Sequence, residues 1–196
     1  LALLYAEHNP EKVLSLLLRG VFLCRKNDIQ WFYQYGASEI YPNYWENYIS
    51  IVEPSKRDDI LSAYHDMIFS DDKNLSLRAC KEWSLWEGRS SCLIPSEVVI
   101  NSFDECSISL AKIESNYFIN DCFIEENQII KNIDKILDIP CTIVHGQYDI
   151  VCPIRQAYDL HKAYPKSNLI IAPDSGHSLL EPRISKEILN KLNDVD

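Results

Sequence analysis

Two short apolar runs near the C-terminal end each lead into polar residues that could transfer a proton. The run Cys141-Thr142-Ile143-Val144 precedes Asp149, and the run 169–172 precedes His177. A histidine acts as a general base when a carboxylate fixes its tautomer and stabilises the imidazolium that forms. Because ligands bind at the carboxyl ends of parallel strands, we expect these two loops to meet there. The pattern predicts Asp149 as a catalytic acid and His177 as its base.

Each of these residues also has a simpler interpretation when it is taken alone. An Asp after a strand is often the N-cap of the next helix, and a Gly-His pair after a strand is often part of an ordinary loop. His145 is a competing base, but we favour a packing role for it beside the site. Cys152 follows Asp149 by three residues. It has no adjacent base, so we interpret it as a buried or site-lining thiol and not as a nucleophile.

The chain lacks the signatures of other common catalytic and cofactor sites. The order acid then histidine matches the α/β-hydrolase order Ser, Asp, His, yet no G-x-S-x-G nucleophile turn occurs in the sequence. No P-loop, G-x-G-x-x-G, H-E-x-x-H or EF-hand pattern occurs either. We therefore expect no cofactor and no metal.

The elements around the two loops alternate between strand and helix. Strand 141–145, helix 153–164, strand 169–172 and helix 184–192 follow one another, and both strands are expected to be buried. This alternation predicts parallel strands in an α/β sheet. At the start of the chain, a helix over 1–8 and a buried strand over 13–18 belong to the same layer.

The middle of the chain has a different character. It contains all four Trp residues and little strand-like alternation. Its apolar residues recur at helical spacing, which predicts a helical subdomain. The helical faces comprise Ile60, Leu61, Tyr64, Met67 and Ile68; Leu75, Ala79, Cys80, Trp83 and Trp86; and, more loosely, Leu110, Ala111, Ile113, Tyr117 and Phe118. We thus predict core segments over 1–24 and 134–196 that flank a helical insertion over 25–133.

Composition narrows the classes of partner. The 196 residues carry a net charge of −10, which argues against nucleic acid as a partner. No apolar run is long enough to span a membrane, and the first residues do not form a signal peptide. Seven scattered cysteines, with no C-x-x-C pair, fit reduced thiols and predict a cytoplasmic protein. The sequence predicts nothing about oligomeric state.

Several motifs along the whole chain resemble those of proline iminopeptidases, which are α/β-hydrolase serine peptidases. Two of them are specific: Trp83-Ser84-Leu85-Trp86-Glu87-Gly88, and Val144-His145-Gly146-Gln147-Tyr148-Asp149-Ile150-Val151-Cys152-Pro153. Similar matches are Leu18-Arg19-Gly20-Val21-Phe22-Leu23, Trp31-Phe32-Tyr33-Gln34, Ile113-Glu114-Ser115-Asn116-Tyr117-Phe118 and Gly176-His177-Ser178. The resemblance implies the C-terminal part of an α/β-hydrolase, a parallel-sheet core with an all-helical cap inserted.

The resemblance also implies an activity, the removal of N-terminal proline from peptides. The acid of the family falls on Asp149, its base on His177, and the carboxylates that bind the substrate amine on Glu87 and Glu114. Two carboxylates can pair with the cationic secondary amine of a free proline terminus, and aromatic walls can bury its ring. The residues of the ring pocket are Phe22, Phe32 and Phe118, with Cys152 nearby.

The sequence departs from the family pattern at its amino end. In the family, the nucleophilic serine and the oxyanion-hole loop come before the position that corresponds to Leu1, and neither is present here. We expect the 196 residues alone to be inactive and poorly stable, because the triad acts as a unit and the strands would have open edges. Two alternatives stay open. One is an aminopeptidase of broader specificity or an ester or amide hydrolase of the same fold, and the other is a non-catalytic remnant.

Overall fold

The computed structural model describes residues 1–193, so the last three residues of the predicted segment 134–196 lie outside the described part. The chain forms two compact units, Leu1–Leu23 with Asn127–Asp196, and Cys24–Glu126. We call them the sheet unit and the helical unit, and each is described by itself. None of the helices in residues 1–193 combines the length and apolar character that crossing a membrane requires.

The sheet unit is built on three parallel strands in the order β1-β2-β3, as the alternation of elements predicts. Leu18 of β1 pairs with Ile143 of β2, which in turn pairs with Leu169 of β3. Its elements are α1 (Ala2–His8), η1 (Pro10–Lys12), β1 (Leu16–Arg19), α9 (Gln128–Lys131), η4 (Ile133–Ile136), β2 (Cys141–Gly146), α10 (Ile154–Ala163), β3 (Asn168–Ala172) and α11 (Pro182–Asn193).

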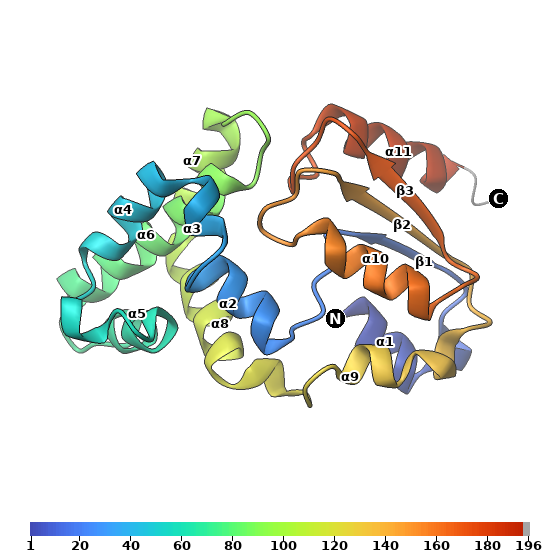
Figure 1. Cartoon of the computed structure of the whole chain (residues 1–196), viewed down its shortest axis with the longest axis horizontal. Coiled ribbons are helices and arrows are strands. Elements are labelled where there is room, and N and C mark those ends of the chain that lie inside the picture. The colour runs from blue at the N-terminus through green and yellow to red at the C-terminus, as the bar shows by residue number, and fades with distance from the viewer. Residues whose placement is uncertain (194–196) are drawn as a thin grey trace. The chain divides into compact units, whose positions relative to one another are not determined.

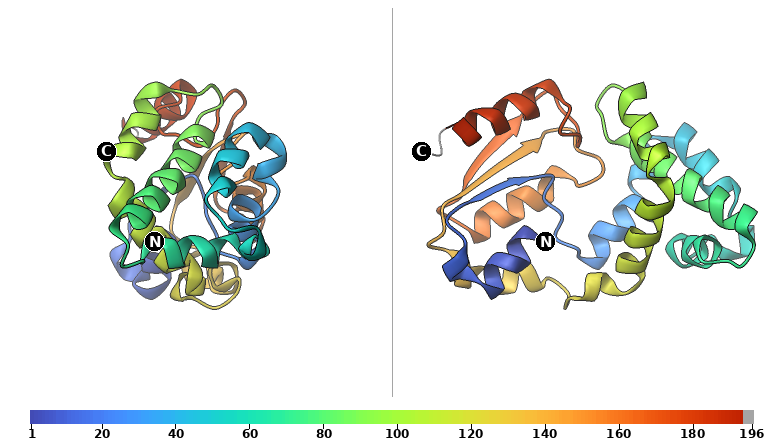
Figure 2. Two further views of the ribbon diagram at one scale, coloured as in Figure 1. Left: turned by 90° about the vertical axis from the view of Figure 1, so that its left-hand side faces the viewer. Right: turned by 180° about the vertical axis from the view of Figure 1, so that it is seen from behind.

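Helices cover both faces of this sheet. Side chains of α1 and α10 join Leu16, Leu18 and Ile143 in the larger core cluster, whereas Ile184 of α11 joins Val144 in a smaller one. Successive residues of a strand point to opposite faces, so Ile143 and Val144 contribute to different clusters. Figures 1 and 2 show α10 and α1 on one side of the sheet and α11 on the other.

Two of the predicted strands differ from the structure in extent or burial. β1 begins at Leu16 and not at Val13, because residues 10–12 form the 3₁₀ turn η1, and Leu14 is exposed. β3 is not a buried strand, and Ile171 is exposed. Strand β3 pairs only with β2 within the described sheet, so its position at the edge leaves part of it open.

The helical unit packs its helices around α6. Its elements are α2 (Lys26–Tyr33), α3 (Ala37–Ile40), α4 (Pro42–Ser50), η2 (Pro54–Lys56), α5 (Ile60–Ile68), α6 (Lys73–Ser90), α7 (Glu97–Glu105), α8 (Ser107–Ile119) and η3 (Asp121–Phe123). Asp72 begins α6 as an N-cap, because its carboxylate accepts the backbone N–H of Asn74 and of Leu75. Aromatic rings fill the centre, where Tyr48 stacks on Tyr64 at 4.3 Å and Tyr33 stacks on Trp83 at 4.4 Å.

The helical unit ends at Glu126, whereas the sequence prediction extends the insertion to residue 133. Residues 127–133 belong to the sheet unit because Ile129 and Ile133 are buried in its core. The predicted face of α8 also changes. Ile113 and Tyr117 are exposed, and the buried side of this helix carries Ala111 and Ser115.

Glu7 of α1 is buried although neither of its carboxylate oxygens has a hydrogen-bond partner within the described residues. Burial raises the pKa of Glu7 from its usual 4.5 to about 7, and the charge of Lys135 offsets this only in part. The folded chain therefore binds more protons than the unfolded chain between these pH values. The contribution of Glu7 to stability therefore falls as pH rises through this range.

We expect Glu7→Gln to remove this loss of stability. In urea unfolding of the chain, the drop in unfolding free energy between pH 5 and pH 8 should be larger in the wild type than in Glu7→Gln by on the order of 2 kcal/mol, because the raised pKa of Glu87 contributes to the drop in both. Glu11→Gln, at an exposed glutamate close by, is the control and should keep the drop. An equal drop in the wild type and in Glu7→Gln would contradict this assignment.

Candidate active site

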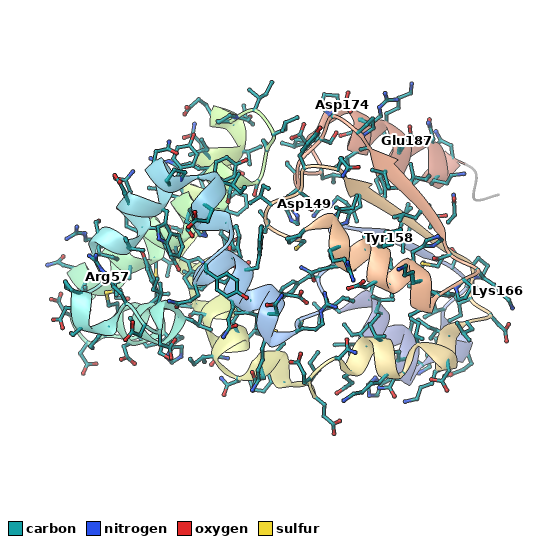
Figure 3. All side chains as sticks on the ribbon, viewed as in Figure 1. Arg57, Asp149, Tyr158, Lys166, Asp174 and Glu187 are labelled. Carbon is teal, nitrogen blue, oxygen red and sulfur yellow. The ribbon has the colours of Figure 1, made fainter. Side chains whose placement is uncertain are left out.

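Asp149 and His177 lie against each other at the carboxyl end of the sheet. Asp149 follows β2 and His177 follows β3, and Nδ1 of His177 lies 2.9 Å from Oδ2 of Asp149. The carboxylate is buried, with 1% of its side chain exposed, whereas 19% of the His177 side chain is accessible. In Figure 3, Asp149 lies on the loop that leaves β2, and the labelled Asp174 marks the loop that follows β3.

Backbone contacts hold the two loops together. The N–H of Gln147 donates to the carbonyl of Ala172 at 2.8 Å, and the N–H of Tyr148 donates to the carbonyl of Ser175 at 3.0 Å. Gly146 is required at this crossing, because a Cβ there would lie 2.0 Å from the carbonyl oxygen of Gly176. The glycine at the end of β2 thus lets the acid loop and the histidine loop approach each other.

The Asp149 carboxylate is held from its other side by the start of the next segment. Its Oδ1 accepts the backbone N–H of Cys152 at 2.8 Å. This leaves Oδ2 to face His177, so the orientation of the carboxylate is determined. Cys152 is buried, and its backbone carbonyl and N–H contact His145 and Asp149.

Two residues at the end of β1 support His177, and the sequence reasoning assigned them no role. Nη1 of Arg19 donates to the carbonyl oxygen of His177. Gly20 has φ +55°, and a Cβ at this position would lie 2.7 Å from Cε1 of the imidazole. The ring therefore rests where only a glycine leaves room for it. A Gly immediately after an apolar strand was the available signal, since it marks close approach of another group.

The predicted amine-binding glutamates lie together in the helical unit, with partners that the sequence reasoning did not assign. The hydroxyl of Tyr33 donates to Glu87 of α6, and Nε1 of Trp83 donates to Oε2 of Glu114 of α8 at 2.9 Å. Burial, and then the neighbouring charge of Glu114, raise the pKa of Glu87 well above its usual range. Two carboxylates in this position share a proton unless a cation joins them.

The predicted aromatic residues are divided between the units. Phe118 lies beside Tyr33 with ring centroids 5.3 Å apart, and both line a cavity of about 350 Å³ in the helical unit. Phe32 is buried against Trp86 at 5.2 Å, so it forms part of the core of that unit. Phe22 belongs to the sheet unit and is half-buried after β1.

Within residues 1–193, no three His, Cys, Asp or Glu side chains are grouped as the ligands of an ion would be. The polar groups of the sheet unit can instead move a proton, with His177 accepting it and Asp149 stabilising the resulting charge. The glutamate pair of the helical unit can bind a cation.

Several curated proteins that are similar to this chain are named proline iminopeptidase or probable proline iminopeptidase. The chain is 45% identical over 186 residues to a proline iminopeptidase of Xylella fastidiosa, which covers 93% of this chain and 59% of that protein. It is 45% identical to a probable proline iminopeptidase of Leptolyngbya boryana (97% of this chain, 60% of that protein). It is 42% identical to a proline iminopeptidase of Arabidopsis thaliana (96% and 51%). The chain therefore spans about half to three fifths of the length of these relatives.

Two other comparisons add little to this result. No family model matches the sequence. Among solved structures, a bromoperoxidase from Bacillus anthracis matches with a TM-score of 0.46 and 19% identity, over 70% of this chain and 48% of that one, a likeness too distant to bear on function. The parallel sheet and the helical unit fit the C-terminal part of an α/β-hydrolase. Over almost its whole length, the chain is thus homologous to part of proteins that are named proline iminopeptidase.

Proposed function

We propose that the full-length protein is a serine aminopeptidase that releases N-terminal proline from peptides through a Ser-His-Asp triad. The hydrogen bond between Asp149 and His177 carries this proposal, because it provides an oriented base at the open end of the sheet. The names of relatives at 42–45% identity support the choice of substrate. The chain has no G-x-S-x-G, and we propose that the serine lies on a segment before Leu1.

In the proposed reaction, His177 takes the proton of the serine hydroxyl as the serine attacks the carbonyl carbon of the terminal proline. The same imidazole then gives the proton to the leaving amine, and a water molecule hydrolyses the acyl-enzyme by the reverse sequence. Asp149 stabilises the imidazolium in both halves. No metal ion or cofactor takes part in these steps.

The glutamate pair is proposed to recognise the amine of the substrate. Glu87 and Glu114 pair with the secondary ammonium, and Phe22, Phe32 and Phe118, with Cys152 nearby, are proposed to surround the ring. The buried position of Glu87 supports this role, because a buried carboxylate is costly unless an opposite charge compensates it. A cationic substrate supplies that charge. We also propose a cytoplasmic location, supported by seven free thiols.

Hydrolysis of aminoacyl anilides by the full-length protein tests the proposal. We expect kcat/KM to be far higher for the prolyl anilide than for the alanyl and leucyl anilides. Comparable or better cleavage of the alanyl or leucyl compounds would instead support a broader aminopeptidase. Cleavage of acyl esters that lack the amine, at rates that Glu87→Gln leaves unchanged, would support an ester hydrolase.

Gly20→Ala tests whether Gly20 is needed to position the imidazole of His177. The new methyl group would lie 2.7 Å from the imidazole and at a positive φ, so His177 must shift. We expect kcat for the prolyl anilide to fall about 100-fold, because misplacing a reacting group by about 1 Å has an effect of this size. Ser178→Ala, beside the same histidine, is the control and should stay within about threefold. A Gly20→Ala enzyme with wild-type kcat would exclude this function for the glycine.

A further inference from the structure

A second histidine, His145, lies behind Asp149 and takes no part in the proposed proton transfers. It is the fifth residue of β2 and is completely buried. Its Nε2 lies 2.8 Å from the carbonyl oxygen of Cys152 and 3.3 Å from Oδ2 of Asp149. Its Nδ1 lies 3.4 Å from the backbone nitrogen of Val21. One imidazole thereby connects the end of β1, the end of β2 and the acid loop.

These contacts are compatible with one protonation state of His145. The N–H of Val21 donates to Nδ1, so that nitrogen must carry a lone pair. The single proton then sits on Nε2, where it meets two oxygen acceptors, the Cys152 carbonyl and the Asp149 carboxylate. Burial lowers the pKa of His145, and the opposing effect of the Asp149 charge is smaller. His145 is therefore a neutral donor.

A neutral donor and a cation would have different consequences at this position. Oδ2 of Asp149 also accepts from Nδ1 of His177, and Oδ1 accepts from the Cys152 amide. A cation behind the carboxylate would form an ion pair and compete with the imidazolium that develops on His177. A neutral N–H fixes the carboxylate and leaves its charge available to His177.

The other charged groups around His145 fit this interpretation. Asp149 raises the pKa of His145, whereas the nearby His177 and Arg19 lower it. The guanidinium of Arg19 donates to the carbonyl oxygen of His177. A positive charge on Arg19 or on His177 thus opposes protonation of His145.

We infer that His145 is a positioning residue, which holds Asp149 toward His177 as a permanently neutral Nε2–H donor. The inference rests on the proposed function, since Asp149 must serve the base. It differs from the earlier packing interpretation, because it assigns the effect to one hydrogen-bond donor on one ring nitrogen. An apolar side chain of similar size would pack in the same space but would lack that donor.

Three variants of the full-length protein separate the donor from the packing. His145→Gln places an amide N–H where Nε2 was, His145→Asn keeps a polar group only on the Nδ1 side, and His145→Leu keeps neither. We expect kcat for the prolyl anilide to fall about 10- to 100-fold in His145→Leu and His145→Asn with KM within about twofold, and His145→Gln to stay within about threefold of wild type. Equal kcat in His145→Gln and His145→Leu, whether high or low, would overturn the inference.

Nitrogen NMR of the full-length wild-type protein tests the same inference without activity and without any variant that could fail to fold. We expect the His145 ring to remain a neutral Nε2–H tautomer from pH 5.5 to pH 8. A charged ring in this range, or a proton on Nδ1, would overturn the inference. If the full-length wild type does not cleave the prolyl anilide, the proposed function is wrong. The NMR experiment still shows independently whether His145 is a neutral Nε2–H donor.

Discussion

Asp149→Asn is expected to lower kcat of the full-length protein about 10⁴-fold, with little change in KM. The Cys152 amide donates to Oδ1 of Asp149, so the oxygen of an asparagine would remain at that position. Its NH₂ group would then point at His177 and at the Nε2–H of His145. Nδ1 of His177 would have to accept a hydrogen bond, and the proton would move to Nε2. The base would then be protonated on the nitrogen that must take the serine proton.

The measurement is steady-state hydrolysis of the prolyl anilide. Asp174→Asn is the matched control, because Asp174 lies on the neighbouring loop after β3 and is exposed, with Arg183 as an ion-pair partner at 3.7 Å. It should retain activity within about twofold, as expected when an exposed ion pair is removed. An Asp149→Asn enzyme with activity within tenfold of wild type would remove Asp149 from the mechanism.

Glu87→Gln and Glu114→Gln are each expected to raise KM for the prolyl anilide roughly 10- to 100-fold. A hydrogen bond to a charged group contributes about 1.5–3 kcal/mol, and each 1.4 kcal/mol corresponds to a factor of ten. Glutamine keeps the shape, and its oxygen can still accept from Tyr33 or Trp83. The substitution therefore removes charge with little change in packing. Glu105→Gln, at an exposed glutamate of α7, is the control and should leave KM unchanged.

The same pair predicts a pH dependence of substrate binding. The pKa of Glu87 is raised, so its ionised form appears only as pH rises above the ordinary range of a carboxyl group. KM should fall with rising pH as long as the substrate amine stays protonated, and Glu87→Gln should abolish this trend. The pKa of Tyr33 is also raised by burial and by Glu87, so its hydroxyl remains a donor throughout.

Measurements of the unfolding free energy distinguish a role of Glu87 in substrate binding from a role in folding. Removing a buried carboxylate whose ionisation is unfavourable should not lower the unfolding free energy of the chain at pH 8. We expect Glu87→Gln to be as stable as wild type or more stable, while its KM rises. A variant that loses both stability and substrate affinity would assign Glu87 to the structure of the helical unit and not to recognition.

The sequence predicted those features of the molecule that depend on neighbouring residues. Alternation of apolar runs with turn residues is local, so β2, α10 and α11 lie close to their expected ranges. Helical spacing of apolar residues likewise predicted α5 and α6. The loops with Asp149 and His177 follow from the parallel alternation, which brings consecutive strand ends to one edge. Glu87 and Glu114 were indicated only by motif resemblance, since their types and spacing are ordinary for helices.

The features that the sequence did not predict depend on residues far apart in the chain. Arg19 and Gly20 support His177 across more than 150 positions, and Val21 meets His145 across 124. Such contacts arise from the order and register of the strands, which place the end of β1 beside the end of β2. The spacing of residues along the chain does not predict that register.

The burial of β3 and the boundary between the two units likewise depend on tertiary contacts. β3 reads as a buried strand by composition, yet its place at the edge of the described sheet leaves Ile171 exposed. Residues 127–133 read as helical like their predecessors, but Ile129 and Ile133 bury against the sheet unit. The sequence by itself thus determined the types of element and the two loops that carry Asp149 and His177, because local pattern encodes them. The tertiary structure alone decided which groups orient Asp149, His177 and the glutamates, because packing brings distant residues together.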